Sequence, residues 1–339
     1  MPKISVVMAV YNGLPYLPQA MESILNQTLR DFEFIVVEDA SLDDSLSVLR
    51  SYNDRRIRLI VNKKNLGLSR SLNKGLDAAN GEYVARMDHD DISLPTRLAE
   101  QKAYLDTHPQ IDVVGTWAQA FGLNQEQLWR YPVQDEEIRA EMLFYPPIVH
   151  SSAMLRRMTF KKHKLRYDPK TQRAQDYELW ARAASRIRFA NLSKILLRYR
   201  IHPDQIGRHY GADQQASANN VRAGQLREFG LHPCKEELVL HNAISAWKFQ
   251  RSQSGLRNIE NWLLKLRKAN QKTQRYPVEI FNLVLEKRWW AACRSAVNLG
   301  LDSWNFYKDS PLSVATRRGA FETGLFWVKC HLREQGLRR

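Results

Sequence analysis

Three aspartates lie within four positions in Asp88-His89-Asp90-Asp91, directly after the strand predicted at residues 82–87. Carboxylates a few ångströms apart raise one another's pKa, so a nearby positive charge must offset the cluster. A divalent cation does this, and carboxylate oxygens suit Mg²⁺ or Mn²⁺, which can bridge two phosphates and stabilise a diphosphate leaving group. The alternative is an acidic loop that caps the helix predicted from Pro95.

Asp39 and Tyr11 could recognise a nucleotide base. Asp39 follows the apolar run at residues 32–37, and its carboxylate can accept a hydrogen bond from the imide N–H of uracil or thymine. It could instead cap a helix that starts near Ser41. Tyr11 could stack on the base or simply pack beneath the next strand.

Asp176 begins a predicted helix at residues 175–185. A carboxylate there can act as a general base on an acceptor hydroxyl, or can only interact with the helix dipole. His202 follows the last predicted strand and could bind the metal or the diphosphate. His150 is a weaker candidate of the same kind, since a lone histidine often does neither.

These residues need a scaffold that gathers them. Residues 1–120 alternate strand-like and helix-like segments, which predicts a mostly parallel sheet with helices on both faces. Predicted strands at residues 4–10, 32–37, 57–61, 82–87 and 111–115 end in polar residues. Because ligands of open α/β sheets bind at the carboxyl ends of the strands, the candidate residues should meet at one edge.

The chain is predicted to form a catalytic domain at 1–213, with a donor-binding half at about 1–120 and an acceptor half at about 121–213. Residues 214–339 show only helical periodicity. Residues 213–339 hold 21 Lys/Arg against 11 Asp/Glu, and six of the nine tryptophans lie there. Two interpretations stay open: this region binds an anionic membrane surface, or it packs on the catalytic domain.

Composition excludes several classes of protein. Hydrophobic residues at 44% and charged residues at 26% are typical of a soluble globular chain, and no apolar run is long enough for a membrane span. The start of the chain has no signal-peptide pattern, so we expect a cytoplasmic protein, peripheral on the inner membrane face if the basic region binds lipid. Three widely spaced cysteines fit neither a disulfide framework nor a zinc site.

Four segments, in order, resemble glycosyltransferase family 2, whose members have the GT-A fold. They are residues 5–13 (SVVMAVYNG), 36–44 (VVEDASLDD), 65–75 (NLGLSRSLNKG) and 85–91 (ARMDHDD). The resemblance covers roughly residues 3–205. It implies an α/β fold and inversion by single displacement from a nucleotide diphosphate sugar.

The resemblance also implies roles for individual residues. Asp39 would contact the base, Asp88 the ribose and diphosphate, Asp90 the metal, and Asp176 would be the catalytic base. The full predicted site comprises Ala9, Tyr11, Asn12, Asp39, Asn65, Gly67, Ser71, Arg86, Asp88 and His89 for the donor, Asp90 and His202 for Mn²⁺ or Mg²⁺, Asp176 for catalysis, and His150, Glu178 and Trp180 near the acceptor.

The chain departs from the family pattern at several positions. Leu72 replaces a common arginine near the diphosphate, a charge that Arg70 or Arg86 could supply. Gln175 replaces an acidic residue, which leaves Glu178 as the alternative base. Similar members build bacterial surface polysaccharides on a lipid diphosphate, so we expect a UDP-sugar donor, or a dTDP-sugar as the alternative, and a saccharide acceptor.

Other functions fit less well. A nucleotidyltransferase or dinucleotide oxidoreductase needs a glycine-rich first turn, and residues 11–15 contain one glycine. Nucleic-acid binding is supported by charge alone and leaves the aspartates unexplained, so we expect no nucleic-acid partner. A non-catalytic carbohydrate-binding protein would not need Asp39, Asp90 and Asp176.

Overall fold

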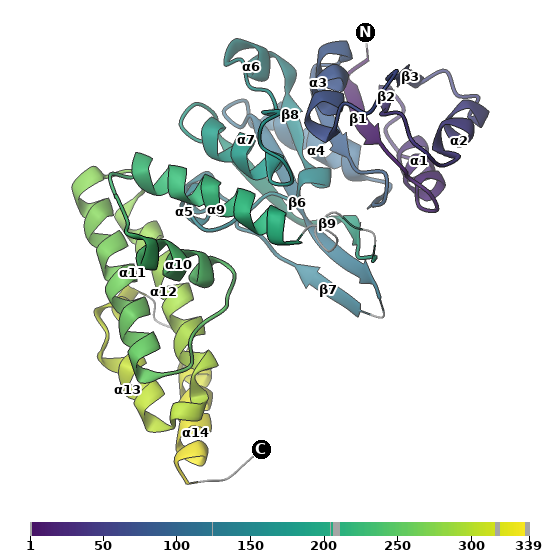
Figure 1. Ribbon diagram of the computed structural model, residues 1–339. Coiled ribbons are helices and arrows are strands. Elements are labelled where there is room, and N and C mark those ends of the chain that lie inside the picture. Colours follow the sequence, from purple (N-terminus) through teal and green to yellow (C-terminus); the bar gives the residue numbers. More distant parts are fainter. Residues whose placement is uncertain (1, 124, 204, 206–210, 316–318, 336–339) are drawn as a thin grey trace. The chain divides into compact units, whose positions relative to one another are not determined.

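The computed structural model describes residues 2–123, 125–203, 205, 211–315 and 319–335. The chain divides into two compact units, Met1–Ile138 with Pro146–Ala218, and Arg139–Tyr145 with Asn219–Arg339 (Figure 1). We call them the sheet unit and the helical unit. The helical unit therefore includes residues 139–145, which lie well before the boundary predicted at residue 213.

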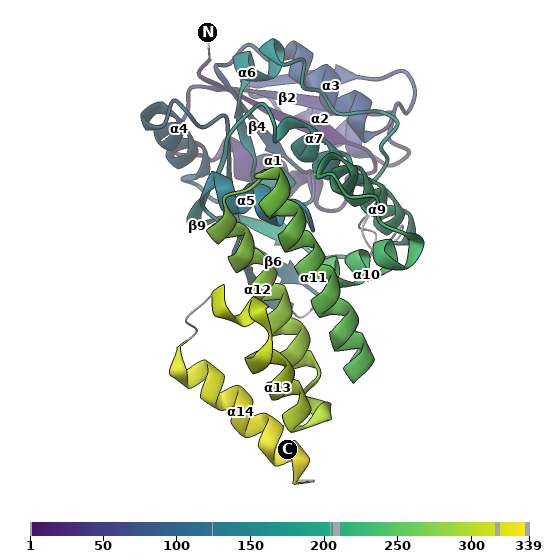
Figure 2. The same cartoon turned by 90° about the vertical axis from the view of Figure 1, so that its left-hand side faces the viewer.

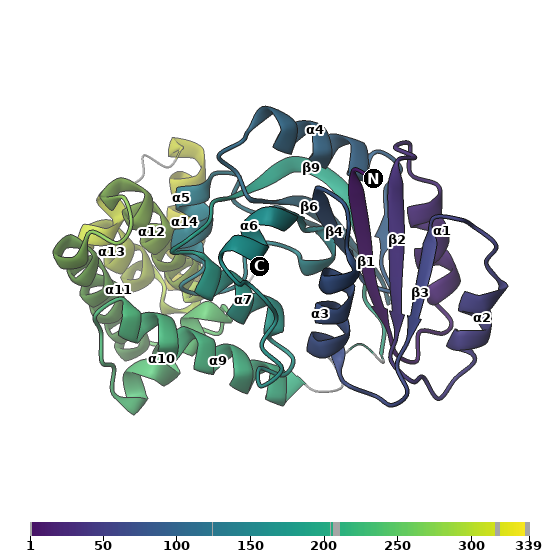
Figure 3. The same cartoon turned by 90° about the horizontal axis from the view of Figure 1, so that it is seen from above.

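The sheet unit is built on four parallel strands. β1 (Ile4–Val10) pairs with β2 (Phe32–Glu38) on one side and β4 (Tyr83–Met87) on the other, and β3 (Ile57–Val61) pairs with β2 (Figure 3). All seven residues of β1 are buried. A continuous apolar run is what a strand covered on both faces requires, which is why the sequence reveals these strands clearly.

Helices cover both faces of this parallel part of the sheet. Val6 and Met8 share a hydrophobic core with α1 (Leu17–Leu25). On the opposite face, Gly75 of α3 (Leu68–Ala78) lies against Val7, where an added Cβ would fall 2.3 Å from a Val7 methyl carbon. Only glycine allows α3 to approach so closely. Two further helices, α2 (Ser45–Ser51) and α4 (Arg97–Thr107), complete this part.

The rest of the sheet is mixed. Its order is β3-β2-β1-β4-β8-β6-β9-β5, with β7 paired to β6. The added strands are β5 (Ile92–Ser93), β6 (Val113–Gly122), β7 (Gln125–Trp129), β8 (Met154–Arg156) and β9 (Phe189–Arg200). β8 is antiparallel to β4 and β6, whereas β6 and β9 are parallel. The fold is therefore mixed α/β with a mostly parallel sheet, as predicted.

Short helices join the strands of this second part. They are α5 (Asp135–Glu141), the 3₁₀ turn η1 (His150–Ser152), α6 (Arg157–Lys162) and α7 (Gln175–Ala183). The predicted helix at residues 175–185 corresponds to α7, whereas the sequence did not predict α5, α6, β5 or β7. These elements have at most seven residues, too few to show a clear period.

The helical unit contains α9 (Gly211–Glu228, in part), α10 (Lys235–Ser245), α11 (Gln253–Thr273), α12 (Val278–Ser295), α13 (Leu301–Asp309) and α14 (Ala320–Glu334), with short 3₁₀ turns η2 (Val297–Leu299) and η3 (Pro311–Ala315) (Figure 2). Trp262, Trp289 and Trp290 are buried in its core, and Trp304 packs against them. Four of the six tryptophans of this region thus lie in or against the core of the unit. Within the described residues, no helix is long and apolar enough to cross a membrane.

Candidate active site

The three aspartates meet at the carboxyl end of β4. Carboxylate oxygens of Asp88, Asp90 and Asp91 lie within 4.8 Å of one another. Asp91 is fully buried, and its carboxylate accepts hydrogen bonds from the Ser151 hydroxyl and from the backbone N–H of Arg200 at 2.8 Å. Burial and the charges of Asp90 and Asp88 raise the pKa of Asp91 well above its usual value. Asp91 therefore anchors the loop at residues 88–91 to η1 and to the end of β9.

Asp90 faces His202, which was predicted from the sequence to bind the same metal. Nε2 of His202 lies 3.1 Å from Oδ2 of Asp90. Burial opposes ionisation of Asp90, but the bond from His202 and the charges of His89 and Arg86 lower its pKa overall. Arg200 donates from Nε to the Asp90 carbonyl at 2.7 Å and stacks on Tyr16 at 4.6 Å. The strand end of β9 thereby holds the loop.

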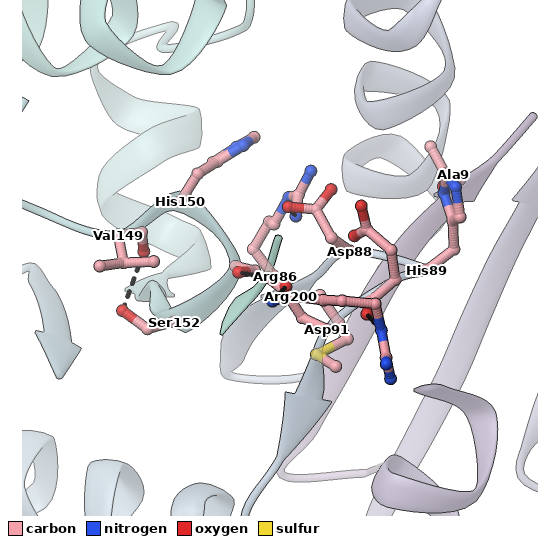
Figure 4. A network of polar contacts seen from close by, with 12 residues as sticks. Ala9, Arg86, Asp88, His89, Asp91, Val149, His150, Ser152 and Arg200 are labelled. Atoms are coloured by element: carbon pink, nitrogen blue, oxygen red, sulfur yellow. Dashed lines mark hydrogen bonds and ion pairs between the residues drawn. The ribbon is translucent and has the colours of Figure 1, made fainter. Parts of the chain in front are cut away.

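Asp88 is paired with Arg86, the penultimate residue of β4. Burial alone would favour the neutral form of Arg86, but the Asp88 carboxylate raises its pKa, so the guanidinium stays charged. Figure 4 shows these two side chains beside each other, with His89 turned toward Ala9. Arg86 Nε is buried without a hydrogen-bond partner among the described residues. Arg86 thus places a positive charge inside the site.

His150 also lies in this region. Its Nε2 is 2.7 Å from the Tyr167 hydroxyl, and Tyr167 is held in turn by Asn73, which donates to its carbonyl at 2.8 Å. Burial, reinforced by the charge of Arg86, lowers the pKa of His150 well below its usual value. His150 is therefore a neutral, hydrogen-bonded imidazole.

Asp39 sits at the end of β2 in a dense hydrogen-bond network. It accepts from the side chain of Asn62 at 2.7 Å and from the backbone N–H groups of Leu66 and Gly67, both at 2.9 Å. Gly67 has φ of +85°, which glycine adopts without strain. Asp39 does not cap α2, whose N-cap is Asp44. Its network instead fixes the turn between β3 and α3.

The remaining donor-site candidates line the same edge. The Ala9 carbonyl lies 3.3 Å from His89 Nδ1, and Tyr11 is 40% exposed, so its ring is free to stack. Asn12 accepts from the backbone N–H of Leu42 at 2.8 Å. Ser71 is buried and accepts from Asn62. Asn65 is exposed on the turn above Asp39.

Asp176 stands in the first turn of α7, within electrostatic range of Asp88 and Arg86. Burial raises the pKa of Asp176 and the Asp88 charge adds to this, outweighing the Tyr177 N–H bond and the Arg86 charge. Burial raises the pKa of Tyr131, and the charge of Asp176 raises it further. The fold thus places Asp176 close enough to Asp88 for their charges to interact, although about ninety residues of sequence separate them.

Glu178 and Trp180, predicted near the acceptor, are both occupied by contacts within the protein. Glu178 forms a two-pronged ion pair with Arg182 at 2.6 and 3.0 Å. Trp180 is fully buried and packs edge-on against His150 and Phe189. Trp180 therefore contacts the His150 ring and has no exposed surface for an acceptor.

The side chains present fit a hard divalent cation. Asp88 and Asp90 keep 26% and 17% of their side-chain surface exposed, and carboxylate oxygen is the ligand type that Mg²⁺ and Mn²⁺ prefer. Asp91 uses both oxygens within the protein. Asp88 and Asp90 are therefore the available ligands, with His202 against Asp90.

Sequence reasoning missed three residues of the site. Asn62 connects Asp39 to Ser71, Arg200 holds the aspartate loop, and Tyr167 bonds His150. Asn62 and Arg200 directly follow or end a strand, so the strand-end rule could have found them. Tyr167 lies in a connecting segment and has no such signal.

Comparison with known proteins identifies the family of the chain. Residues 5–164 match the family described as "Glycosyl transferase family 2". An uncharacterised glycosyltransferase of Haemophilus influenzae is 33% identical over 233 residues, covering 65% of this chain and 72% of that one. The chain belongs to glycosyltransferase family 2. The protein is thus a glycosyltransferase, and the resemblance in its motifs is confirmed.

One further relative and one solved structure are similar to this chain. The amylovoran biosynthesis glycosyltransferase AmsE of Erwinia amylovora is 31% identical over 216 residues, covering 61% of this chain and 79% of that one. The crystal structure of S. aureus TarS 1–349 in complex with UDP-GlcNAc has a TM-score of 0.58 and 18% identity, covering 98% of this chain and 92% of that chain. At this identity, TarS shows that the two proteins share a fold.

Proposed function

We propose that this glycosyltransferase moves a sugar from a UDP-sugar to a saccharide hydroxyl with inversion, in the synthesis of a bacterial surface polysaccharide. The observation that carries the proposal is the position of Asp176, a carboxylate of raised pKa within electrostatic range of Asp88. A base and a cation-binding carboxylate must flank the reacting carbon on the two sides of a displacement.

The reaction follows from that arrangement. The acceptor oxygen bonds to the anomeric carbon as its proton passes to Asp176, and the bond from that carbon to the diphosphate oxygen breaks with its electron pair leaving on the diphosphate. Asp88 and Asp90 would hold Mn²⁺ or Mg²⁺, which neutralises charge on the leaving group when bound. Arg86 adds a second positive charge there.

Donor recognition would lie at the β1 and β2 ends. Tyr11 offers an exposed ring for the base, and Asp39 is held in place by two backbone N–H groups and Asn62. The complex of TarS with UDP-GlcNAc and the name of AmsE support a UDP-sugar donor and a polysaccharide product.

The test is a donor screen followed by a matched pair of variants. The protein is incubated with Mn²⁺ and UDP-, dTDP- and GDP-sugars, and binding is read as a rise in melting temperature, because a ligand of the native state alone stabilises it. We expect a UDP-sugar to give the largest rise. Asp90→Asn should abolish both the rise and transfer, whereas Asp31→Asn, an exposed aspartate before β2, should change neither. Normal transfer by Asp90→Asn would refute the metal role.

A further inference from the structure

Helix α14 has an apolar face that points away from the core of the helical unit. Phe321, Leu325, Val328 and Leu332 recur at the spacing of one helix face. These four residues are 82%, 45%, 42% and 37% exposed, in that order. We call these four residues the outer stripe. A contiguous exposed apolar patch of this kind is typical of a surface that binds another protein or a membrane.

The opposite face already anchors α14. Phe326 is buried against Trp290 and Trp304, with ring centroids 5.1 and 5.8 Å apart, and Cys330 is fully buried. Figure 2 shows α14 on the outside of the unit beside α13. Phe326 and Cys330 therefore anchor the helix, while each residue of the outer stripe keeps between 37% and 82% of its surface exposed within the described part of the chain.

The stretch of sequence that contains the stripe is basic, since residues 316–339 contain six Lys/Arg and two Asp/Glu, a net charge of +4. Within α14 itself, Lys329 and Arg333 are balanced by Glu322 and Glu334. Lys329 and Arg333 lie on the exposed surface of α14. Trp327, 42% exposed, stacks on His331 at 5.2 Å. Basic residues beside an apolar face and an exposed tryptophan are the features of helices that lie in a lipid interface.

A second copy of the chain is a poorer occupant. From the exposed fractions, the outer stripe with Trp327 offers on the order of 500 Å², using side-chain areas of roughly 150–250 Å² for the aromatic residues. A stable interface buries about 800 Å² on each partner and is depleted of lysine. A flat bilayer needs no such complementary area and attracts the net positive charge.

We propose that α14 lies in the surface of an anionic lipid bilayer, with the outer stripe inserted and Lys329 and Arg333 at the headgroups. This goes beyond the proposed glycosyl transfer and does not depend on the donor or the metal. It assigns membrane contact to one helix, whereas the buried tryptophans of the core have no part in it.

The full-length protein is mixed with vesicles of phosphatidylcholine containing phosphatidylglycerol, and with vesicles of phosphatidylcholine alone, and binding is measured by co-sedimentation. We expect binding to the anionic vesicles that weakens at high salt. Leu325→Gln/Val328→Gln should lose it. Lys329→Gln/Arg333→Gln should weaken it about 30-fold, at about tenfold per 1.4 kcal/mol.

The matched control is Met158→Gln/Val239→Gln, which removes two apolar residues of 63% and 62% exposure elsewhere. It should bind vesicles like the wild type, and Asp90→Asn should do so as well, which separates this proposal from the catalytic one. Circular dichroism checks that each variant folds. Failure of the wild type to bind anionic vesicles, or unchanged binding by Leu325→Gln/Val328→Gln, would overturn the proposal. A wild-type dimer that this pair converts to a monomer, without vesicle binding, would assign the stripe to self-association.

Discussion

The charged clusters of the two units differ in their exposure to solvent. In the sheet unit, Asp88 and Asp90 keep part of their surface exposed beside a third carboxylate. In the helical unit, Glu141 and Arg288 are almost fully buried, with 2.7 Å between Oε2 and Nη2, and the guanidinium stacks on Phe144 at 3.7 Å. The first cluster is open to a ligand, whereas the second is closed.

Because of this difference in exposure, we expect substitutions in one cluster to affect activity and substitutions in the other to affect stability. A buried pair of opposite charges neutralises itself, and removing one member leaves the other as an uncompensated charge in a low-dielectric core. Asp88 and Asp90 have protein partners in Arg86 and His202, but they keep part of their surface exposed. Shape-conserving changes at these two residues should therefore affect activity more than the free energy of unfolding. Variants at the two places should therefore fail in different assays.

The largest effect should come from Asp176→Asn. The amide keeps the shape of the side chain but cannot accept the acceptor's proton, so kcat should fall about 10²- to 10⁴-fold with the melting temperature unchanged or raised. Initial rates of sugar transfer and calorimetry measure the two quantities. Glu178→Gln is the control, since Glu178 is occupied by Arg182. A loss confined to Glu178→Gln would transfer the role of base to that residue.

Glu141→Ala should destabilise the helical unit. It leaves Arg288 buried without its carboxylate, which should reduce the free energy of unfolding by about 3–5 kcal/mol. Urea unfolding followed by tryptophan fluorescence reports on the helical unit, because six of the nine tryptophans lie there. Glu279→Ala, an exposed acid in the first turn of α12, should cost less than about 1 kcal/mol. Equal losses from both variants would show that the buried pair is not a stabilising contact.

Ligand addition should stabilise the open cluster alone. Mn²⁺ with a nucleoside diphosphate at about 100 times its Kd should add roughly 2.7 kcal/mol to the sheet unit, a rise of about 5–10 °C. Peptide-resolved hydrogen exchange should show the protection at residues 83–91 and not at residues 281–292 of α12. EDTA should reverse it. Protection that spreads equally over both segments would contradict an open site confined to the sheet unit.

Sequence reasoning was strongest where one physical cause dominates. β1 and residues 34–37 of β2 are rich in apolar residues because both faces of these strands are buried. The polar residue after each strand marks the ligand edge. Asp39, Asp88 and Asp90 were found in this way. β5 has two residues, and its pairing with Arg198 and Leu197 of β9 depends on segments about a hundred residues apart. No local pattern encodes such a contact.

The same limit applies to the closed cluster. Glu141 and Arg288 are separated by 147 positions, and neither differs in its sequence surroundings from an exposed charge. Helical periodicity was predicted for residues 214–339, and His241 and Ile244 of that region are buried on one face of α10. The hydrogen bonds of His241 were not predicted, since periodicity reports which residues are buried and not which partners they find.

The smallest effect should be a loss of stability in mild acid from His241. This residue is fully buried. Its Nε2 lies 3.1 Å from the Leu143 carbonyl and its Nδ1 accepts from Trp262 at 3.1 Å, which requires the neutral ring. Burial, with smaller effects from Arg222 and Arg288, lowers its pKa from 6.5 to about 3.

Because the folded-state pKa lies below the unfolded value, the unfolded chain binds the proton first, and stability falls as the pH drops below about 6.5. The loss between pH 7 and pH 5 should be about 2 kcal/mol, read by urea unfolding with tryptophan fluorescence. His241→Gln can keep both hydrogen bonds without titrating, so its stability should change less over this range. His232→Gln, at an exposed site, should retain the wild-type slope. An unchanged slope in His241→Gln would mean that another group carries the acid sensitivity, and that the helical unit is less closed than its hydrogen bonds indicate.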